Sequence, residues 1–188
     1  ILYWDGERVQ AFDGREAAPA GVTEQLFLQA DGEPMPFRQA QIGGRSVGVP
    51  GVLRALQMAH QRYGKLPWRD LFAPAIALAR SGFAVSPRLH TLIAGDPFIA
   101  QSPAMARYFL DEQGRPLPVG ATLRNPALAQ TLELIAAHGA DVFYSGEIAQ
   151  AMVAQVRSHA NPGYLSLQDL QQYQARQLSL IHISEPTR

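Results

Sequence analysis

Cysteine is absent from all 188 residues, and its absence removes several kinds of site at once. Disulfide bridges, thiolate nucleophiles and zinc sites with cysteine ligands are excluded. The absence of cysteine does not indicate whether the protein works in an oxidising or a reducing compartment. Long apolar runs are missing too. Because a membrane-spanning helix needs roughly 18 consecutive apolar residues, we expect no membrane span.

An excess of charge of either sign is also missing. The chain carries 16 Lys and Arg residues against 16 Asp and Glu residues. A neutral chain without a basic block offers no electrostatic attraction for nucleic acid or for an anionic membrane surface, so neither is predicted as a partner. Hydrophobic residues make up 47% of the chain, which is enough to build a core, and wholesale disorder is therefore excluded.

The chain is β-like at its start and becomes helical later. Residues 1–4 and 8–12 are short β-prone runs, and Asp5-Gly6 between them predicts a hairpin. A short helix is predicted over residues 22–28. A chain that opens inside a β-prone run is typical of a piece of a longer protein, so we expect the natural chain to begin earlier.

The later part carries signals for both ends of its predicted helices. Apolar residues recur there at helical spacing. A capping side chain followed by proline predicts a helix start, and glycine predicts a helix end. The starts are Ser86 and Asn125, with a weak capping-box variant at Ser166, and the ends are Gly64, Gly82 and Gly139. Together these elements predict an α+β fold that is mostly helical with an N-terminal β-hairpin.

Residues able to catalyse a reaction or bind a metal do not assemble into a site. None of the five histidines is paired with a carboxylate at helical spacing, so no metal site is predicted. Residues 43–48 are glycine-rich but lack the Gly-Lys-Ser/Thr of a phosphate loop and the spacing of a dinucleotide loop, which favours close backbone packing instead. No nucleophile lies beside a base, so no catalytic residue and no cofactor is assigned.

Arg15 is the residue that its chemistry singles out. It follows a predicted strand, in the turn Asp13-Gly14-Arg15-Glu16. A guanidinium group there is able to bind a carboxylate through two parallel hydrogen bonds. The alternative is a local surface ion pair with Asp13 or Glu16, and residue types alone favour this local pairing.

The turn around Arg15 resembles a motif of the γ-glutamyltranspeptidase family. Residues 12–20 read Phe-Asp-Gly-Arg-Glu-Ala-Ala-Pro-Ala, which is similar to that family's Asp-x-Arg-Glu-x-Ala-Pro motif. Later segments are similar to the same family in the same order. They are residues 47–51, 63–68, 74–79 followed by 82–83, 143–146, and 165–170 followed by Tyr173. Each segment alone is unspecific, but their shared order over residues 1–177 is specific.

The resemblance implies part of the large subunit of an N-terminal-nucleophile hydrolase with a four-layer αββα sandwich. Members are made as one precursor that cleaves itself, and the new N-terminal threonine of the small subunit is the nucleophile. Such an enzyme transfers or hydrolyses the γ-glutamyl group of glutathione or a related amide. By this resemblance Arg15 binds the α-carboxylate of the glutamyl group, and the small subunit of the same precursor is a partner. The chain alone is expected to be inactive without the threonine, and a periplasmic or secreted location is expected.

Two alternatives stay open at this point. Some relatives are acylases that act on β-lactam side chains, and the motifs do not exclude them. A non-catalytic helical scaffold or binding module is the alternative from a different class, and it is favoured by the missing catalytic constellation. A threonine at the start of a downstream segment that resembles the small subunit would distinguish the enzyme from the scaffold.

Residues 178–188 depart from the family pattern. The family continues with a segment that contains arginine and proline, whereas this chain ends in Leu-Ser-Leu-Ile-His-Ile-Ser-Glu-Pro-Thr-Arg. These eleven residues are identical to a translation of the transposon-end adapter used to prepare sequencing libraries. We therefore expect residues 1–177 to be a partial large subunit and residues 178–188 to be a non-native tail that is left out of fold reasoning. The alternative is a natural amphipathic tail.

Overall fold

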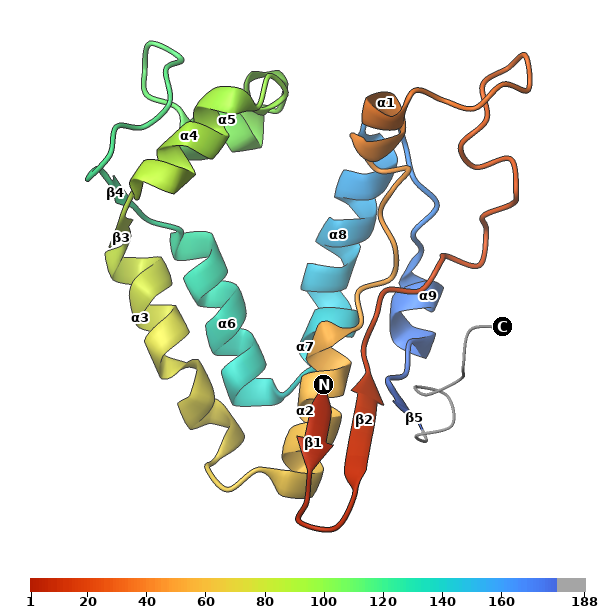
Figure 1. The fold of residues 1–188 in the computed structure, drawn as a ribbon, viewed down its shortest axis with the longest axis vertical. Helices are drawn as coiled ribbons and strands as arrows, with labels where there is room; N and C mark the ends of the chain where they lie inside the picture. The colour runs from red at the N-terminus through yellow and green to blue at the C-terminus, as the bar shows by residue number, and fades with distance from the viewer. Residues whose placement is uncertain (179–188) are drawn as a thin grey trace. The chain divides into compact units, whose positions relative to one another are not determined.

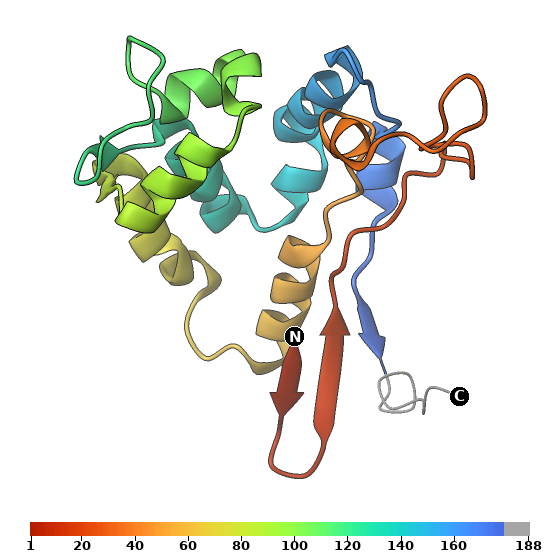
Figure 2. The same ribbon diagram turned by 45° about the horizontal axis from the view of Figure 1, so that its top comes forward.

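The first residues form the β-hairpin that the sequence predicts. In this computed structural model, which describes residues 1–178, β1 (Leu2–Trp4) pairs antiparallel with β2 (Val9–Asp13). β5 (Arg176–Leu178) pairs antiparallel with the other edge of β2, so the strand order is β1-β2-β5 (Figures 1 and 2). The middle of β2 is buried: it is paired on both edges and packs against the helix that ends at Tyr63.

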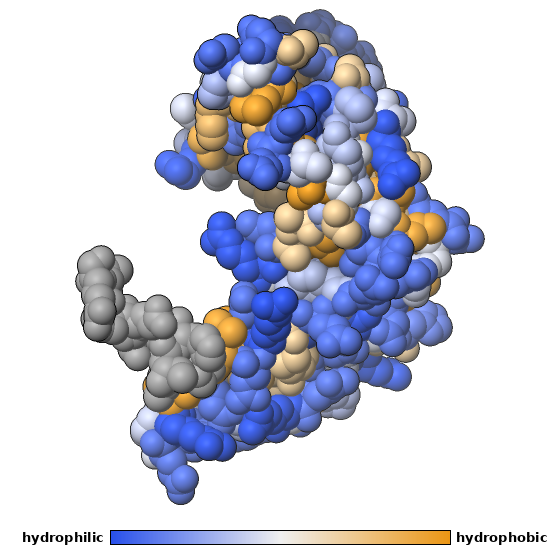
Figure 3. All heavy atoms as spheres, turned by 90° about the vertical axis from the view of Figure 1, so that its right-hand side faces the viewer, coloured by the Kyte–Doolittle hydropathy of each residue, from blue (hydrophilic) through white to orange (hydrophobic). Residues whose placement is uncertain are grey.

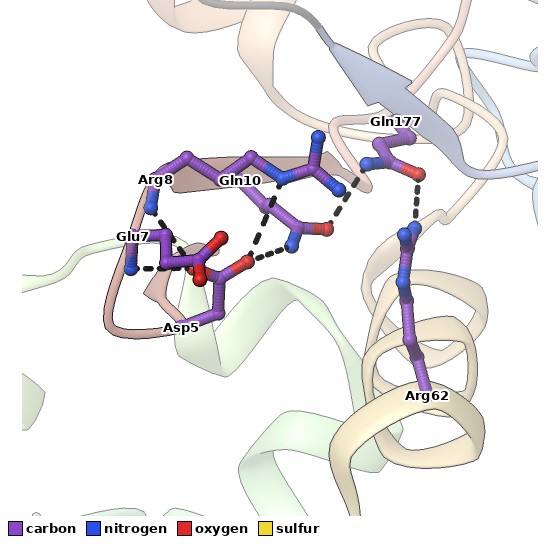
Figure 4. Close-up of polar contacts among 6 residues, drawn as sticks. All are labelled: Asp5, Glu7, Arg8, Gln10, Arg62 and Gln177. Carbon is purple, nitrogen blue, oxygen red and sulfur yellow. Dashed lines mark hydrogen bonds and ion pairs between the residues drawn. The ribbon is translucent and has the colours of Figure 1, made fainter.

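Asp5 organises the hairpin turn (Figure 4). Its Oδ1 accepts hydrogen bonds from the backbone N–H groups of Glu7 and Arg8, each at 2.9 Å. Its Oδ2 accepts a third hydrogen bond from Gln10 Nε2 at 2.6 Å. The carboxylate therefore joins the turn to the strand that follows it.

We expect this turn to loosen in acid. Hydrogen bonds from the backbone of Arg8 and Glu7 and from the Gln10 side chain lower the pKa of Asp5 from 3.8 to about 2. A carboxyl group whose pKa is lowered on folding stabilises the fold above its unfolded pKa and loses that contribution as the pH falls through the folded value. The loss should therefore occur between about pH 4 and about pH 2.

An NMR titration of the Glu7 and Arg8 amide protons measures this directly. We expect a shared midpoint near the folded pKa of Asp5, about 2. The matched control is Asp5→Asn, which keeps an oxygen acceptor and removes the titrating group, so the midpoint should vanish. A wild-type midpoint at the ordinary value for aspartate, near 4, would contradict the prediction.

Helix α2 (Val52–Tyr63) packs against the sheet through its last turn. The Tyr63 ring stacks on Tyr3 with centroids 4.1 Å apart and meets Phe12 edge-on at 6.2 Å. Arg62 donates a hydrogen bond to Gln177 of β5 at 2.6 Å, a contact also drawn in Figure 4. The helix ends at Gly64, as predicted, where the N–H of that glycine donates to the carbonyl of His60 at 2.7 Å.

The main core of residues 1–68 and 137–178 lies where three helices meet. They are α7 (Asp141–Tyr144), α8 (Gly146–Ser158) and α9 (Leu167–Gln172). The capping box predicted at Ser166 is present: its hydroxyl accepts from the N–H of Asp169, whose carboxylate accepts from the N–H of Ser166. The buried side chains of this core are Val49, Ala140, Tyr144, Ala149, Val156, Leu165 and Leu170.

The glycine-rich segment forms a close backbone crossing, as predicted. The N–H of Gly44 donates to the carbonyl of Asn161 at 2.8 Å, and the N–H of Gly163 donates to the carbonyl of Val156 at 3.0 Å. A methyl group on Gly163 would lie 1.9 Å from the Gly44 oxygen. Only glycine fits at this distance, and backbone packing accounts for both residues.

The helix predicted over residues 22–28 is wrong. The segment consists of turns, with hydrogen bonds from Leu26 to Thr23 and from Leu28 to Gln25 that each span three residues. None of its residues is buried, so no packing stabilises a helix this short. A short helix that the sequence did not indicate, α1 (Phe37–Gln41), follows instead.

Residues 69–136 form a second unit with its own small core. The predicted starts are confirmed, because Ser86 Oγ accepts from the N–H of Leu89 at 3.1 Å and Asn125 Oδ1 accepts from the N–H of Leu128 at 2.9 Å. Gly82 ends a helix at a φ of +86°. The elements are η1 (Trp68–Phe72), α3 (Ala73–Ser81), β3 (Phe83–Ala84), α4 (Pro87–Gly95), η2 (Ile99–Gln101), α5 (Pro103–Phe109), β4 (Thr122–Leu123) and α6 (Pro126–His138).

Apolar side chains also remain on the surface. On β1 and just before it, Ile1 is 52%, Leu2 67% and Trp4 59% exposed. Among residues 1–178, no strand pairs with the outer edge of β1. The face drawn in Figure 3 is mostly hydrophilic, with scattered apolar patches. No helix within residues 1–178 has the length and apolar character needed to cross a bilayer.

The predicted tail lies almost wholly outside the described residues. Leu178, its first residue, is the last residue of β5 and lies opposite Ala11. Residues 179–188 are not described. Their assignment as a non-native tail therefore stays a prediction.

Candidate functional site

Arg15 lies in an exposed turn directly after β2. The Asp13 carboxylate accepts a hydrogen bond from the Arg15 backbone N–H at 2.9 Å, which bends the chain away from the strand. The Arg15 side chain is 81% exposed, and its Nε lies 3.3 Å from Glu16 Oε1. The local pairing that residue types favour is therefore present with Glu16. Because so exposed an ion pair contributes about 0–1 kcal/mol, it leaves the guanidinium free to exchange partners.

The backbone around Arg15 is held by contacts from distant parts of the chain. Tyr173, which follows α9, donates its hydroxyl to the Arg15 carbonyl at 2.7 Å. Ala17 and Val49 exchange backbone hydrogen bonds at 3.2 and 2.8 Å. The turn is therefore fixed at its backbone, whereas the Arg15 side chain extends into solvent.

Asp169 fixes the segment that follows the turn. Its Oδ1 accepts from the N–H of Ala20 at 2.9 Å, while its Oδ2 accepts from the hydroxyl of Ser166 at 2.6 Å. Burial is the largest influence on this carboxyl group and raises its pKa, but the hydrogen bonds from Ser166 and Ala20 together outweigh burial and hold the pKa below its ordinary value. Asp169 is thus charged at neutral pH, and it ties this segment to α9.

An open pocket of about 460 Å³ lies beside the turn. Two arginines and three carboxylates reach it, together with an aromatic ring and small apolar residues. Its lining consists of Asp13, Arg15, Glu16, Ala17, Ala18, Ala20, Val49, Asp169, Gln172, Tyr173, Gln174 and Arg176. The two guanidinium groups and three carboxylates among these described lining residues suit the pocket to binding and orienting a charged molecule.

Sequence reasoning placed Arg15 here and missed two other residues of the pocket. Arg176 enters it because β5 pairs with β2, which puts Arg176 opposite Asp13. Tyr173 belongs to a family-like segment, but nothing in the sequence indicated that its hydroxyl contacts the turn. Both contacts depend on strand pairing and helix docking between residues far apart in the chain.

The comparison with protein families decides what kind of chain this is. The model of the family described as Gamma-glutamyltranspeptidase matches residues 1–185. The chain belongs to this family. The relationship inferred from motif order is confirmed, and the α+β class is confirmed with it.

Individual relatives agree with the family match. The "Glutathione hydrolase proenzyme" of Arthroderma benhamiae is 40% identical over 166 residues, covering 86% of this chain and 27% of that protein. The solved γ-glutamyltranspeptidase of Pseudomonas nitroreducens, complexed with L-DON, is 33% identical with a TM-score of 0.81, covering 95% of this chain and 51% of that one. The solved cephalosporin acylase of Bacillus halodurans is 28% identical with a TM-score of 0.78, covering 95% and 33%. The chain spans between 24% and 30% of the length of these and similar curated relatives.

Proposed function

We propose that the whole protein transfers or hydrolyses γ-glutamyl groups of glutathione-like amides. The observation that supports this most is the family match over residues 1–185. Within the matched residues, the Asp-x-Arg-Glu turn lies at the edge of an open pocket. A curated relative carries the name glutathione hydrolase proenzyme. In this proposal the described residues of this chain contribute binding and scaffold, and the nucleophile comes from elsewhere in the protein.

In this proposal Arg15 binds the α-carboxylate of the glutamyl group. The guanidinium is planar and presents two N–H groups in parallel, which matches the two oxygens of a carboxylate. In the structure its partner is the exposed carboxylate of Glu16, 3.3 Å away. A substrate carboxylate would replace that weak surface partner.

The nucleophile is proposed to lie in the small subunit of the same precursor, as the N-terminal threonine produced by self-cleavage. The word "proenzyme" in the relative's name supports a precursor of this kind. Residues 1–177 alone should therefore be inactive. The same resemblance supports export to the periplasm or secretion, which fractionation of expressing cells would test.

Turnover of γ-glutamyl-p-nitroanilide by the whole protein tests the proposal. We expect the purified protein to divide into two subunits and to release p-nitroaniline, faster when an acceptor dipeptide is added if transfer dominates. The chain of residues 1–177, assayed in parallel, should match the blank. A whole protein that lacks both self-cleavage and turnover would support the scaffold alternative.

A β-lactam side-chain acylase is the second candidate, supported by the likeness to a cephalosporin acylase at 28% identity. The two activities differ in the donor group. Glutaryl-7-aminocephalosporanic acid and γ-glutamyl-p-nitroanilide offered to the same preparation separate them. We expect a higher kcat/KM for the γ-glutamyl donor, and the reverse order would favour the acylase.

A further inference from the structure

The hydroxyl of Tyr173 joins two parts of the chain that are 158 residues apart. It donates to the carbonyl of Arg15 at 2.7 Å, the usual length of a well-formed O–H···O hydrogen bond. The Arg15 side chain itself is 81% exposed and forms an ion pair with the neighbouring Glu16. The Arg15 backbone is therefore held at its carbonyl by Tyr173 and at its N–H by Asp13.

The ring of Tyr173 is held in place by the core. It lies nearly parallel to Tyr144, with an interplanar angle of 10° and centroids 6.1 Å apart. Tyr144 is only 1% exposed, and the Arg54 guanidinium carbon lies 4.3 Å from its ring centroid. Arg54 is in turn paired with Asp141. The phenol is thus supported from the core side and cannot turn away without disturbing packed residues.

Space for the hydroxyl exists because residue 51 is glycine. A methyl group on Gly51 would lie 2.0 Å from the Tyr173 oxygen and 2.6 Å from the carbonyl oxygen of Gly14. A methyl group on Gly14 would lie 2.4 Å from the Ala55 methyl group. Gly14, Gly51 and Tyr173 therefore fit together around the turn, and the fit leaves little room for movement.

The hydroxyl also stays protonated. Burial and then the nearby Asp13 carboxylate raise the pKa of Tyr173 above its ordinary value, while Arg176 acts in the opposite direction. A protonated phenol is a hydrogen-bond donor across neutral and mildly alkaline pH. The hydroxyl of Tyr173 is therefore able to donate to the Arg15 carbonyl at neutral pH.

We propose that Tyr173 is a positioning residue for Arg15, which holds the Arg15 backbone so that the guanidinium meets the substrate carboxylate. The inference rests on the proposed function of Arg15. A flexible, exposed side chain binds a ligand well only if the backbone that carries it is fixed, because small displacements of a binding group weaken binding strongly. In this proposal Tyr173 fixes the Arg15 backbone and does not itself bind the substrate carboxylate.

The test uses the whole protein with two donors. One is γ-glutamyl-p-nitroanilide, and the other is 4-aminobutyryl-p-nitroanilide, which lacks the α-carboxylate. Tyr173→Phe should raise KM roughly three- to ten-fold for the first donor, the effect of losing one hydrogen bond, with kcat nearly unchanged. With the second donor kcat/KM should stay the same. In an Arg15→Ala background Tyr173→Phe should add nothing, because the two residues act through one contact.

Controls separate failure of this inference from failure of the proposed function. Tyr164→Phe removes a hydroxyl from a tyrosine that is 49% exposed in the same unit, and it should change nothing. A wild-type protein without γ-glutamyl turnover would overturn the proposed function. A wild-type protein that is active and sensitive to Arg15→Ala, combined with a Tyr173→Phe effect equal for both donors or additive with Arg15→Ala, would overturn only the positioning role.

A second variant covers the case in which Tyr173→Phe does not fold. Replacing Tyr173 with 3,5-difluorotyrosine keeps the shape and the hydroxyl but moves its pKa toward neutrality. The KM for the γ-glutamyl donor should then rise with pH relative to wild type, as the donor is lost by ionisation. A ratio of the two KM values that does not change with pH would overturn the positioning role.

Discussion

Arg15→Ala in the whole protein should lower kcat/KM for γ-glutamyl donors by roughly 30-fold to a few thousand-fold. In the whole protein we expect the bound substrate to cover the guanidinium. Removing one partner of such a desolvated, hydrogen-bonded charge pair costs about 2–5 kcal/mol, and about 1.4 kcal/mol corresponds to each factor of ten. The loss should appear mainly in KM if the contact is equally strong in the ground state and the transition state. Steady-state kinetics with γ-glutamyl-p-nitroanilide measures both parameters.

Arg15→Lys is the matched variant for this experiment. Lysine keeps the charge but loses the planar pair of N–H groups, so its kcat/KM should fall between wild type and Arg15→Ala. Self-cleavage should survive in both variants, because it needs no bound carboxylate. Equal losses on donors with and without the α-carboxylate would mean that Arg15 is structural, and the binding role would then be abandoned.

Gly163→Ala should destabilise the protein by about 1–3 kcal/mol or more. The added methyl group would lie 1.9 Å from the Gly44 oxygen and 2.7 Å from a Val156 methyl group. Two backbones meet here, and the crossing is fixed by the Asn161 side chain, which donates to the Ile42 carbonyl at 2.8 Å. Since backbone atoms cannot rotate away as a side chain would, the clash must be relieved by separating the two loops.

Urea unfolding of the whole protein measures this loss, with Gly95→Ala as the matched control. Gly95 is the last residue of α4, and a methyl group there meets no atom within 4 Å. Alanine at that position should be neutral or stabilise by about 0.4–1 kcal/mol, because it restricts the unfolded chain. Similar unfolding midpoints for the two variants would show that the crossing is looser than the structure indicates.

The elements that the sequence predicted correctly are those stabilised by hydrogen bonds between residues only a few positions apart. The hairpin at Asp5-Gly6 forms because a carboxylate and the next few N–H groups meet locally. The caps at Ser86 and Ser166 form because the hydroxyl of each residue reaches an N–H three positions later. The family could likewise be recognised from the sequence, because the order of short motifs along the chain does not depend on the fold.

The short helix expected over residues 22–28 shows that local composition alone does not determine whether a helix forms. Its composition allows a helix, but a helix of that length is marginal without a face to bury, and none of these residues is buried. The same reasoning explains the glycine-rich segment. Its composition indicated close packing, but only the folded chain shows that Gly163 is what Gly44 packs against.

The identity of Arg15 as the candidate binding residue came from the sequence, and the surroundings of Arg15 came only from the tertiary structure. Tyr173 reaches the Arg15 carbonyl across 158 positions, and Arg176 faces Asp13 because β5 pairs with β2. Contacts of this kind depend on how helices and strands dock, which no window of neighbouring residues records. The motif thus singles out Arg15 as the candidate, whereas the packing of Gly51 and Tyr144 around Tyr173 places the tyrosine hydroxyl against the Arg15 carbonyl.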